Sequence, residues 1–215
     1  NNNTALGHTA LYTADGTNYN TAVGYRAMRQ TTTGDDNTAV GFQSLYSNTT
    51  GFRNVAVGNE SLYSSTIATN NLAIGFRAMR TTTTGDSNTA VGNQALYSNT
   101  TGYGTTFVGA YAGYSLTTGY ANTFVGNGQN AAGYYITTGS KNTILGNYSG
   151  NQGGLDIRTA SNYIVLSDGD GNPRQIIDSS GNLGLGVTPS ASSGSAKILE
   201  IGVPGNSIRS GTNDV

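Results

Sequence analysis

The chain repeats a five-residue motif, Asn-Thr-Ala-(Val/Leu)-Gly, at a fixed interval of 17 residues, and this period constrains its fold more than any other feature. A sequence that repeats at such an interval builds stacked units, each of which contacts mainly its neighbours. The motif glycines are Gly7, Gly24, Gly41, Gly58, Gly75, Gly92, Gly109 and Gly126. Gly146 follows after 20 residues, with the extra residues near Ala131–Gly133, and Asn162–Leu166 resembles a degenerate tenth copy.

The residue types within each repeat predict β-structure. Thr-Ala-Val favours a strand, and clusters such as Thr33-Gly34-Asp35 favour turns. Seventeen residues suit one rung of a parallel β-solenoid made of two short strands and two turns. The recurring Asn would stack as a ladder of amides that bond to one another, and the recurring Gly marks a bend or a close approach of two backbones. We therefore expect an all-β fold with a β-solenoid over residues 1–150.

The composition excludes several classes of function. Charged residues make up 10% of the chain and the formal net charge is −1, so nothing favours binding to nucleic acid. The absence of Cys and the single His argue against a metal site, and no cofactor is predicted. No apolar stretch is long enough to cross a bilayer, so membrane insertion is not expected.

A longer repeat overlies the 17-residue one. The segment Gly24–Arg29 returns 51 residues later as Gly75–Arg80, and Leu45–Gly51 returns as Leu96–Gly102. This spacing indicates that three 17-residue units were duplicated together.

At two positions of the repeat the sizes of the residues vary in opposite directions along the chain. With the motif glycine as position zero, position −2 is Ala in the first six copies and position +4 is then Leu or Met. In later copies position −2 becomes Phe107, Phe124 and Ile144, while position +4 becomes Gly113, Asn130 and Gly150. We expect the two positions to fill one shared space at constant volume.

Position −1 is aliphatic in every copy, from Leu6 to Leu145. Neighbouring residues on a strand point to opposite faces, so positions −1 and −2 cannot share one interior. A thin rung has only one inside. The second apolar layer therefore predicts that copies of the same chain cover it, and oligomerisation also offers stability to a chain without disulfides.

The sequence changes character after residue 150. Asn162–Arg174 is typical of a hairpin, and Gln175–Pro189 of a strand, a turn and another strand. Residues 151–215 are thus predicted to form a β-hairpin-rich neck or connector.

The repeat Asn-Thr-Ala-Val-Gly, followed by Ala-Leu-Tyr-Ser-Asn-Thr-Thr-Gly, resembles repeats in the tail fibres of bacteriophages. It is more loosely similar to the heads of trimeric autotransporter adhesins. Both resemblances imply a homotrimer, and the adhesin heads imply a left-handed parallel β-roll. The string over 162–200 resembles the segment that precedes the intramolecular chaperone of phage fibres and tailspikes.

The stretch Ser87–Ser140 holds no charged residue and is rich in Tyr. Exposed Tyr beside Asn and Thr suits stacking and hydrogen bonding with sugars. Because Tyr recurs at position +5, packing between rungs or chains is the alternative. The predicted ligand-binding residues are Tyr111, Tyr114, Tyr120, Tyr134 and Tyr135.

Other polar groups give weaker predictions. Asp168–Asn172 has the alternating oxygens of a calcium loop but lacks its Gly and Glu, which favours a plain turn. Glu60 and Glu200 lie far apart in the chain, so a paired-carboxylate hydrolase is not predicted and no catalytic residue is assigned. The arginines at positions +2 and +5 could bind an anionic glycan, although a solvated face is the simpler interpretation; they are Arg26, Arg29, Arg77 and Arg80.

These observations predict a non-enzymatic, homotrimeric segment of a phage tail fibre in the virion, which attaches to glycans or receptors on the host surface. A head domain of a trimeric adhesin on a bacterial cell surface is the first alternative. An ice-binding β-solenoid that uses rows of Thr is the second.

Overall fold

A computed structural model describes residues 2–128, 131–190, 198–201 and 207–209. Within these residues the protein is all-β, without a helix, and forms a parallel β-solenoid of about 11 turns with rungs of about 17 residues. Each motif copy supplies one short strand. These strands are β1 (Thr4–Leu6), β2 (Thr21–Val23), β3 (Thr38–Val40), β4 (Val55–Val57), β5 (Leu72–Ile74), β6 (Thr89–Val91), β7 (Thr106–Val108), β8 (Thr123–Val125) and β9 (Thr143–Leu145).

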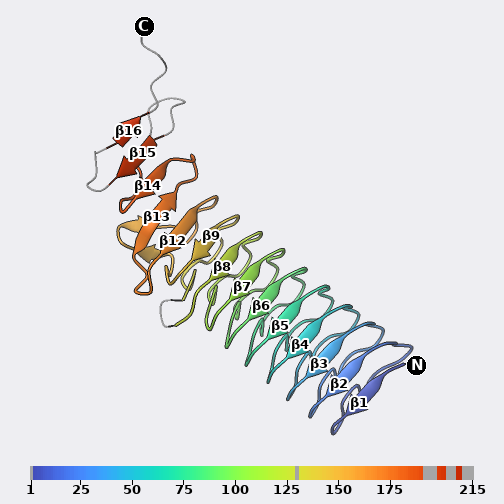
Figure 1. Ribbon diagram of the computed structural model, residues 1–215. Coiled ribbons are helices and arrows are strands. Elements are labelled where there is room, and N and C mark those ends of the chain that lie inside the picture. Colours follow the sequence, from blue (N-terminus) through green and yellow to red (C-terminus); the bar gives the residue numbers. More distant parts are fainter. Residues whose placement is uncertain (1, 129–130, 191–197, 202–206, 210–215) are drawn as a thin grey trace.

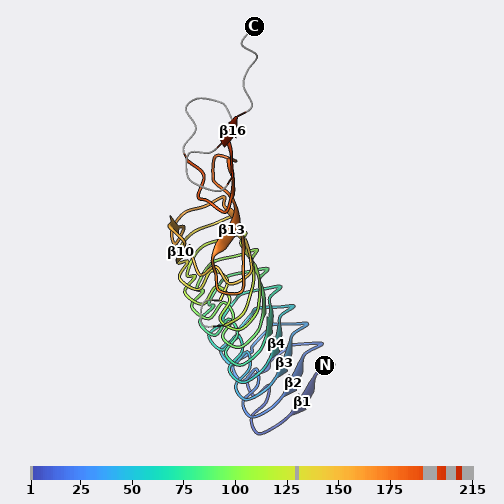
Figure 2. The same ribbon diagram turned by 60° about the vertical axis from the view of Figure 1, so that its left-hand side comes forward.

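The strands stack in one parallel sheet with every motif residue beside its counterpart in the next rung. Ala22 pairs with Ala39, for example, and Val23 with Val40. Figures 1 and 2 show the resulting rod, with β1 at one end and the C-terminal strands at the other. This register creates columns, because each position of the repeat lies directly above the same position of the rung below.

Each rung contains one strand instead of the two that the sequence predicts. The remaining residues form tight turns in which positions +2 and +4 have left-handed backbone, with φ of 52° at Gln43 and 50° at Leu45. Left-handed residues break an extended strand. Their amides bond to adjacent rungs instead: Gln43 N donates to Tyr25 O at 2.9 Å and Leu45 N donates to Ser61 O at 2.9 Å.

The core is a single column of small and large apolar side chains. The central residue of each strand points inward, and the Leu or Met at position +4 packs against it; Ala39 and Leu45, for instance, are fully buried in one cluster. Position −1 points to the opposite, outer face of the strand. The prediction that positions −1 and −2 face different ways is confirmed.

The predicted exchange of volume is visible where Phe enters the core. A Cβ added to Gly113 would overlap the ring of Phe107, and a Cβ added to Gly133 would overlap the ring of Phe124. The two rings stack with centroids 4.5 Å apart. For Phe124 the sequence assigned position +4 to Asn130, which lies outside the described residues. Gly133 takes that place because the extra residues precede Ala132, which accepts the amide of Gly113 at 2.9 Å.

The motif asparagines form a buried ladder, but mostly with the backbone and not with one another. Asn20 Oδ1 accepts the amide of Asn37 at 2.9 Å, and Asn37 Nδ2 donates to Gly51 O at 2.9 Å. Direct amide–amide bonds occur from Asn54 to Asn37 and from Asn71 to Asn54. The buried turn has backbone donors and acceptors that need partners, and the Asn side chains satisfy them.

The motif glycines lie where two rungs approach most closely. Gly24 has φ of 132° and Gly75 has φ of 134°, a region that L side chains rarely adopt. A Cβ at either glycine would also overlap the carbonyl of the motif glycine in the next rung. The sequence prediction of a close backbone approach is therefore confirmed.

Parallel stacking continues past residue 150. Strand β12 (Ile164–Ser167) pairs parallel with β9, which confirms Asn162–Leu166 as a tenth copy. The small antiparallel pair β10 (Asn151–Gln152) and β11 (Leu155–Asp156) lies between them in sequence. The strands that follow are β13 (Pro173–Ile177), β14 (Leu183–Leu185), β15 (Ile198–Ile201) and β16 (Ser207–Arg209). Antiparallel pairing joins β12 to β13 and β13 to β14, β14 pairs parallel with β15, and β15 pairs antiparallel with β16.

The shared space of Phe107 and Gly113 can be tested by a swap. Phe107→Ala alone should destabilise the fold by about 3 kcal/mol or more, because it leaves a cavity. Gly113→Leu alone should also destabilise it, because the new side chain meets the Phe107 ring. The double variant reproduces the neighbouring rung, which has Ala90 and Leu96, and should recover most of the loss. Urea unfolding measures all three, and additive losses in the double variant would contradict the shared space.

Candidate functional site

The structure brings four of the five predicted tyrosines together and places the fifth elsewhere. Tyr111, Tyr114, Tyr134 and Tyr135 form one aromatic cluster, with ring centroids 4.9–6.3 Å apart. Tyr120 stacks instead on Tyr103 at 5.1 Å. The Lys141 ammonium lies 5.8 Å from the centroid of Tyr120.

Tyr at position +5 packs into columns that run along the rod. Tyr97, Tyr114 and Tyr134 stack in succession, with centroids 5.1 Å apart at each step and nearly parallel planes. Both faces of the Tyr114 ring are therefore covered by neighbouring rings. The cluster partly buries Tyr134, and this partial burial raises the pKa of its phenol, with further effects from Tyr114 and the other two rings. Packing between rungs is thus an established role of this column.

Tyr135 is the member of the cluster that is most open to solvent. Its side chain is 47% exposed, and its ring meets Tyr134 edge-on at 4.9 Å. Tyr135 lines a pocket of about 520 Å³ together with polar residues from its own rung and from the rungs on either side. The other lining residues are Ser115, Thr137, Asp156, Arg158 and Thr159. An aromatic ring beside hydroxyls and charged groups can both stack on and hydrogen-bond to a small polar molecule.

One ion pair lies on the wall of this pocket. Arg158 Nη2 donates to Asp156 Oδ2 at 2.7 Å, and Arg158 Nε donates to Asp156 Oδ1 at 3.0 Å. The Arg158 guanidinium lowers the pKa of Asp156, so this carboxylate stays charged at neutral pH. The pair offers both donors and acceptors to a ligand hydroxyl. No pattern in the sequence pointed to this pair, because Asp156 and Arg158 lie outside the regular repeat.

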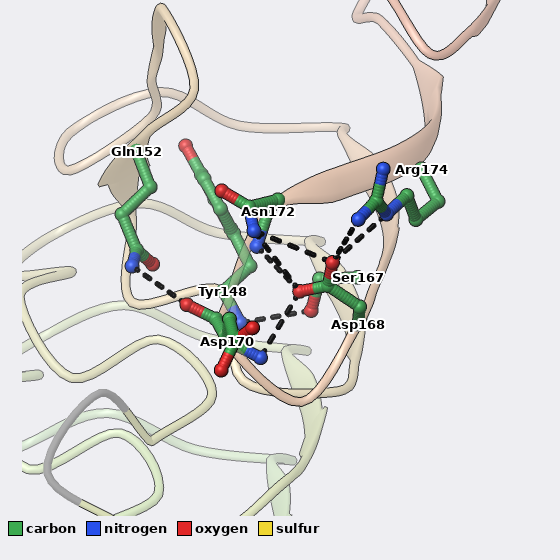
Figure 3. Close-up of polar contacts among 7 residues, drawn as sticks. All are labelled: Tyr148, Gln152, Ser167, Asp168, Asp170, Asn172 and Arg174. Carbon is green, nitrogen blue, oxygen red and sulfur yellow. Dashed lines mark hydrogen bonds and ion pairs between the residues drawn. The ribbon is translucent and has the colours of Figure 1, made fainter.

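The Asp168–Asn172 segment forms the turn between β12 and β13 (Figure 3). The Asp168 carboxylate accepts the amides of Asp170 at 3.0 Å and Asn172 at 2.9 Å, and it pairs with the Arg174 guanidinium. Hydrogen bonding from Asn172, with a contribution from Arg174, lowers the pKa of Asp168 to about 2. The carboxylate that a calcium ion would need is thus occupied by a cation and by backbone donors.

No cluster of three or more His, Asp or Glu side chains able to hold a metal ion occurs in the part of the chain that the structure describes. Among the same residues, no helix is long and apolar enough to cross a bilayer.

Because the Asp168 carboxylate is already paired with Arg174, calcium should leave the Asp168–Asn172 turn unchanged. Millimolar CaCl₂ is expected not to shift the thermal midpoint of the protein, because Arg174 already neutralises Asp168. Differential scanning calorimetry with and without EDTA measures this. A rise with calcium that disappears in Asp168→Asn would contradict the assignment.

Arginines at positions +2 and +5 form a second polar site on the rod. Arg77 Nε and Arg80 Nε both donate to Glu60 Oε2 at 2.8 Å. Arg77 also lies over the ring of Phe76, and Arg80 over the ring of Tyr63. Burial opposes the charge on Glu60, but the hydrogen bonds from Arg80 and Arg77 outweigh it and lower the pKa of this carboxyl below its ordinary value. We call this arrangement the arginine clamp.

Positions +2 and +5 lie on the same side of the rod. Their columns place Arg80 next to Tyr97 in the +5 series, which continues through Tyr114 to Tyr134. The arginines and the aromatic cluster therefore belong to one polar face.

Glu60→Gln should remove a pH-dependent contribution to stability. Glu60 has a lowered pKa in the folded state, so its contribution is complete above its ordinary pKa of about 4.5 and is lost as the pH falls through the folded-state value. The group is partly exposed, so the expected loss at pH 7 is about 1 kcal/mol or less. Thermal unfolding of wild type and variant should differ at pH 7 and differ less at pH 3. Equal differences at both pH values would contradict the role of the charge.

Comparisons of the chain with protein-family models, with curated proteins and with solved structures found no match. The resemblance to phage tail fibres therefore rests on the repeat and on the string over 162–200 alone.

Proposed function

We propose that the protein is a structural and receptor-binding segment of a phage tail fibre, which acts as a homotrimer and without enzymatic activity. The observation that supports this most is an aliphatic row along the outer face of the sheet. Position −1 supplies one such side chain in every rung, and Val40 is 37% and Leu145 44% exposed. Contiguous apolar surface of this kind marks an interface.

Two further copies of the same chain are the occupants that best fit this row. The row is as long as the rod and repeats with the spacing of the rungs, so a parallel copy of the chain presents apolar groups at matching heights. Beyond the regular repeats the strand register continues it through Leu166 and, after Gln175, to the exposed Leu185 and Ile201. Few charges interrupt it. In a trimer, the second apolar layer of each chain would be covered by the same layer of the other two chains.

Attachment would use the polar face described above. The pocket beside Tyr135 offers an aromatic ring, hydroxyls and the Asp156–Arg158 pair to a saccharide on the host surface. Single sites of this size bind sugars weakly, but three copies on one fibre raise the overall affinity by effective concentration. The location that follows is the virion tail fibre. The head of a bacterial cell-surface adhesin would use the same assembly and remains the alternative.

An ice-binding role has one observation in its favour. Position −3 places Thr beside the aliphatic row on the outer face, with gaps at Val55 and Leu72. The other Thr column is committed to structure, because Thr49 Oγ1 donates to Thr66 O at 3.0 Å and its counterparts do the same. A trimer buries the outer face and leaves no Thr array for ice. Inhibition of ice recrystallisation at micromolar protein would favour this role over the fibre.

The trimer can be tested by placing charge in the aliphatic row. Val40→Glu combined with Ile74→Glu should convert the trimer to monomer, because the carboxylates would be buried at the interface. Thr84→Glu, at an exposed turn position, is the matched control and should stay trimeric. Light scattering gives the mass of each. A wild-type protein that is a folded monomer in dilute buffer would refute the assembly.

The glycan site can be tested at its exposed ring. Tyr135→Ala should weaken binding of the trimer to a glycan array by about tenfold or more, because it removes the stacking surface. Tyr111→Ala and Tyr114→Ala test the inner members of the cluster, whose rings are more covered. Tyr103→Ala, an exposed ring outside the cluster, serves as the control. Unchanged binding in all three cluster variants would remove these residues from the site.

A further inference from the structure

The 51-residue duplication copied the arginine clamp but not its carboxylate. Arg26 lies over the ring of Tyr25 at 4.8 Å as Arg77 lies over Phe76 at 4.7 Å. Arg29 lies over Tyr12 at 5.4 Å as Arg80 lies over Tyr63 at 5.0 Å. The residue that corresponds to Glu60 is Thr9.

The backbones of the two copies match closely. Thr9 and Glu60 both have φ of 54°, and Arg26 and Arg77 have φ of 58° and 56°. Arg26 N donates to His8 O at 3.0 Å, and Arg77 N donates to Asn59 O at 2.9 Å. The two sites therefore differ mainly in whether a carboxylate reaches between the guanidinium groups.

The N-terminal copy is left with unsatisfied donors. Arg26 Nε, Arg29 Nε and Thr9 Oγ1 are covered from solvent and have no hydrogen-bond partner, whereas both Nε atoms of the other copy donate to Glu60. Among the described residues, neither Arg26 nor Arg29 has a carboxylate within 4.0 Å. Covered guanidinium donors without an acceptor are costly. An anion that enters between the two partly exposed arginines and displaces the side chains covering their Nε atoms would satisfy them.

We propose that Arg26, Arg29 and Thr9 form a binding notch for the carboxylate of an acidic saccharide, such as a uronate unit of a host surface polymer. The carboxylate would take the place that Glu60 occupies in the other copy and accept both Nε donors. The choice of a saccharide rests on the attachment function proposed above. The choice of a carboxylate rests on the clamp alone.

The surroundings of the notch favour a sugar over an acidic peptide. Tyr12, at the edge of the notch, is 66% exposed. Arg29 Nη1 donates to the Tyr46 hydroxyl at 3.5 Å, and Thr9 contributes its own hydroxyl. Such a rim offers hydrogen bonds to ring hydroxyls and an exposed aromatic face on which a sugar ring can stack.

The test is a calorimetric titration of the assembled protein with a galacturonate oligomer and with its neutral methyl ester. The acid should bind at one site per chain, in a salt-dependent way, and the ester at least tenfold more weakly. Arg26→Gln combined with Arg29→Gln should lower the affinity for the acid by about tenfold or more. Arg53→Gln, which removes one charge from an arginine outside the notch, should leave it unchanged. Binding that ignores the arginine pair would overturn the proposal.

Reciprocal exchanges provide the sharpest control, since both keep the backbone that the chain already uses. Thr9→Glu should fill the notch from within, raise the thermal midpoint and abolish binding of the acid. Glu60→Thr should open the second clamp and raise the stoichiometry from one to two per chain. Unchanged binding in Thr9→Glu, or no added site in Glu60→Thr, would contradict the proposal.

The outcomes also separate this inference from the attachment function. If the galacturonate oligomer does not bind but Tyr135-dependent binding to other glycans is observed, the notch is refuted and attachment stands. If an acidic peptide competes as well as the oligomer at equal carboxylate concentration, the saccharide assignment is overturned. If neither acidic nor neutral glycans bind, both proposals fail.

Discussion

Backbone hydrogen bonds between rungs in a constant register are the constraint on which the rest of the structure depends. Each strand pairs with the next so that a residue lies beside its counterpart 17 positions along the chain. The motif glycines permit this, because any side chain at that position would overlap the carbonyl of the adjacent rung. Once the register is fixed, every position of the repeat becomes a column. The aliphatic row, the Tyr stack and the Asn ladder are all consequences of it.

The columns also explain how much of the fold the sequence could predict. The length of the rung, the buried Ala and the outward Val could be predicted from the spacing of the motif and the alternation of strand residues. The pairing of a large Phe107 with a small Gly113 could be predicted from the nearly constant volume of the core. The single strand per rung does not, because Leu45 and Gln43 adopt left-handed backbone that their residue types do not favour. The Asn ladder was predicted as amide–amide contacts, since the sequence does not show which buried backbone groups need partners.

The candidate site could be predicted only where its residues recur at a fixed position of the repeat. Tyr at position +5 recurs, so its stacking could be expected, but which ring stays open depends on the break in the repeat that brings Tyr135 beside Asp156 and Arg158. Those two residues have no periodic signal. The arginine clamp did have a periodic signal, because a 51-residue offset aligns Thr9 with Glu60. Its meaning required the structure, which shows the Glu60 carboxylate between two guanidinium groups.

The closeness of the two copies of the triplet bears on how such a rod changes over time. Because the junctions between the first six 17-residue rungs are alike, a block of three can be inserted there without disturbing the units on either side. Each insertion lengthens the rod and supplies another pair of guanidinium groups in the same orientation. Under the binding role proposed for the notch, one substitution at the position of Thr9 and Glu60 decides whether the new block carries an internal ion pair or an additional binding site. One duplication can thus increase both the length of the rod and the number of arginine pairs, and later substitutions can change each pair without changing the length.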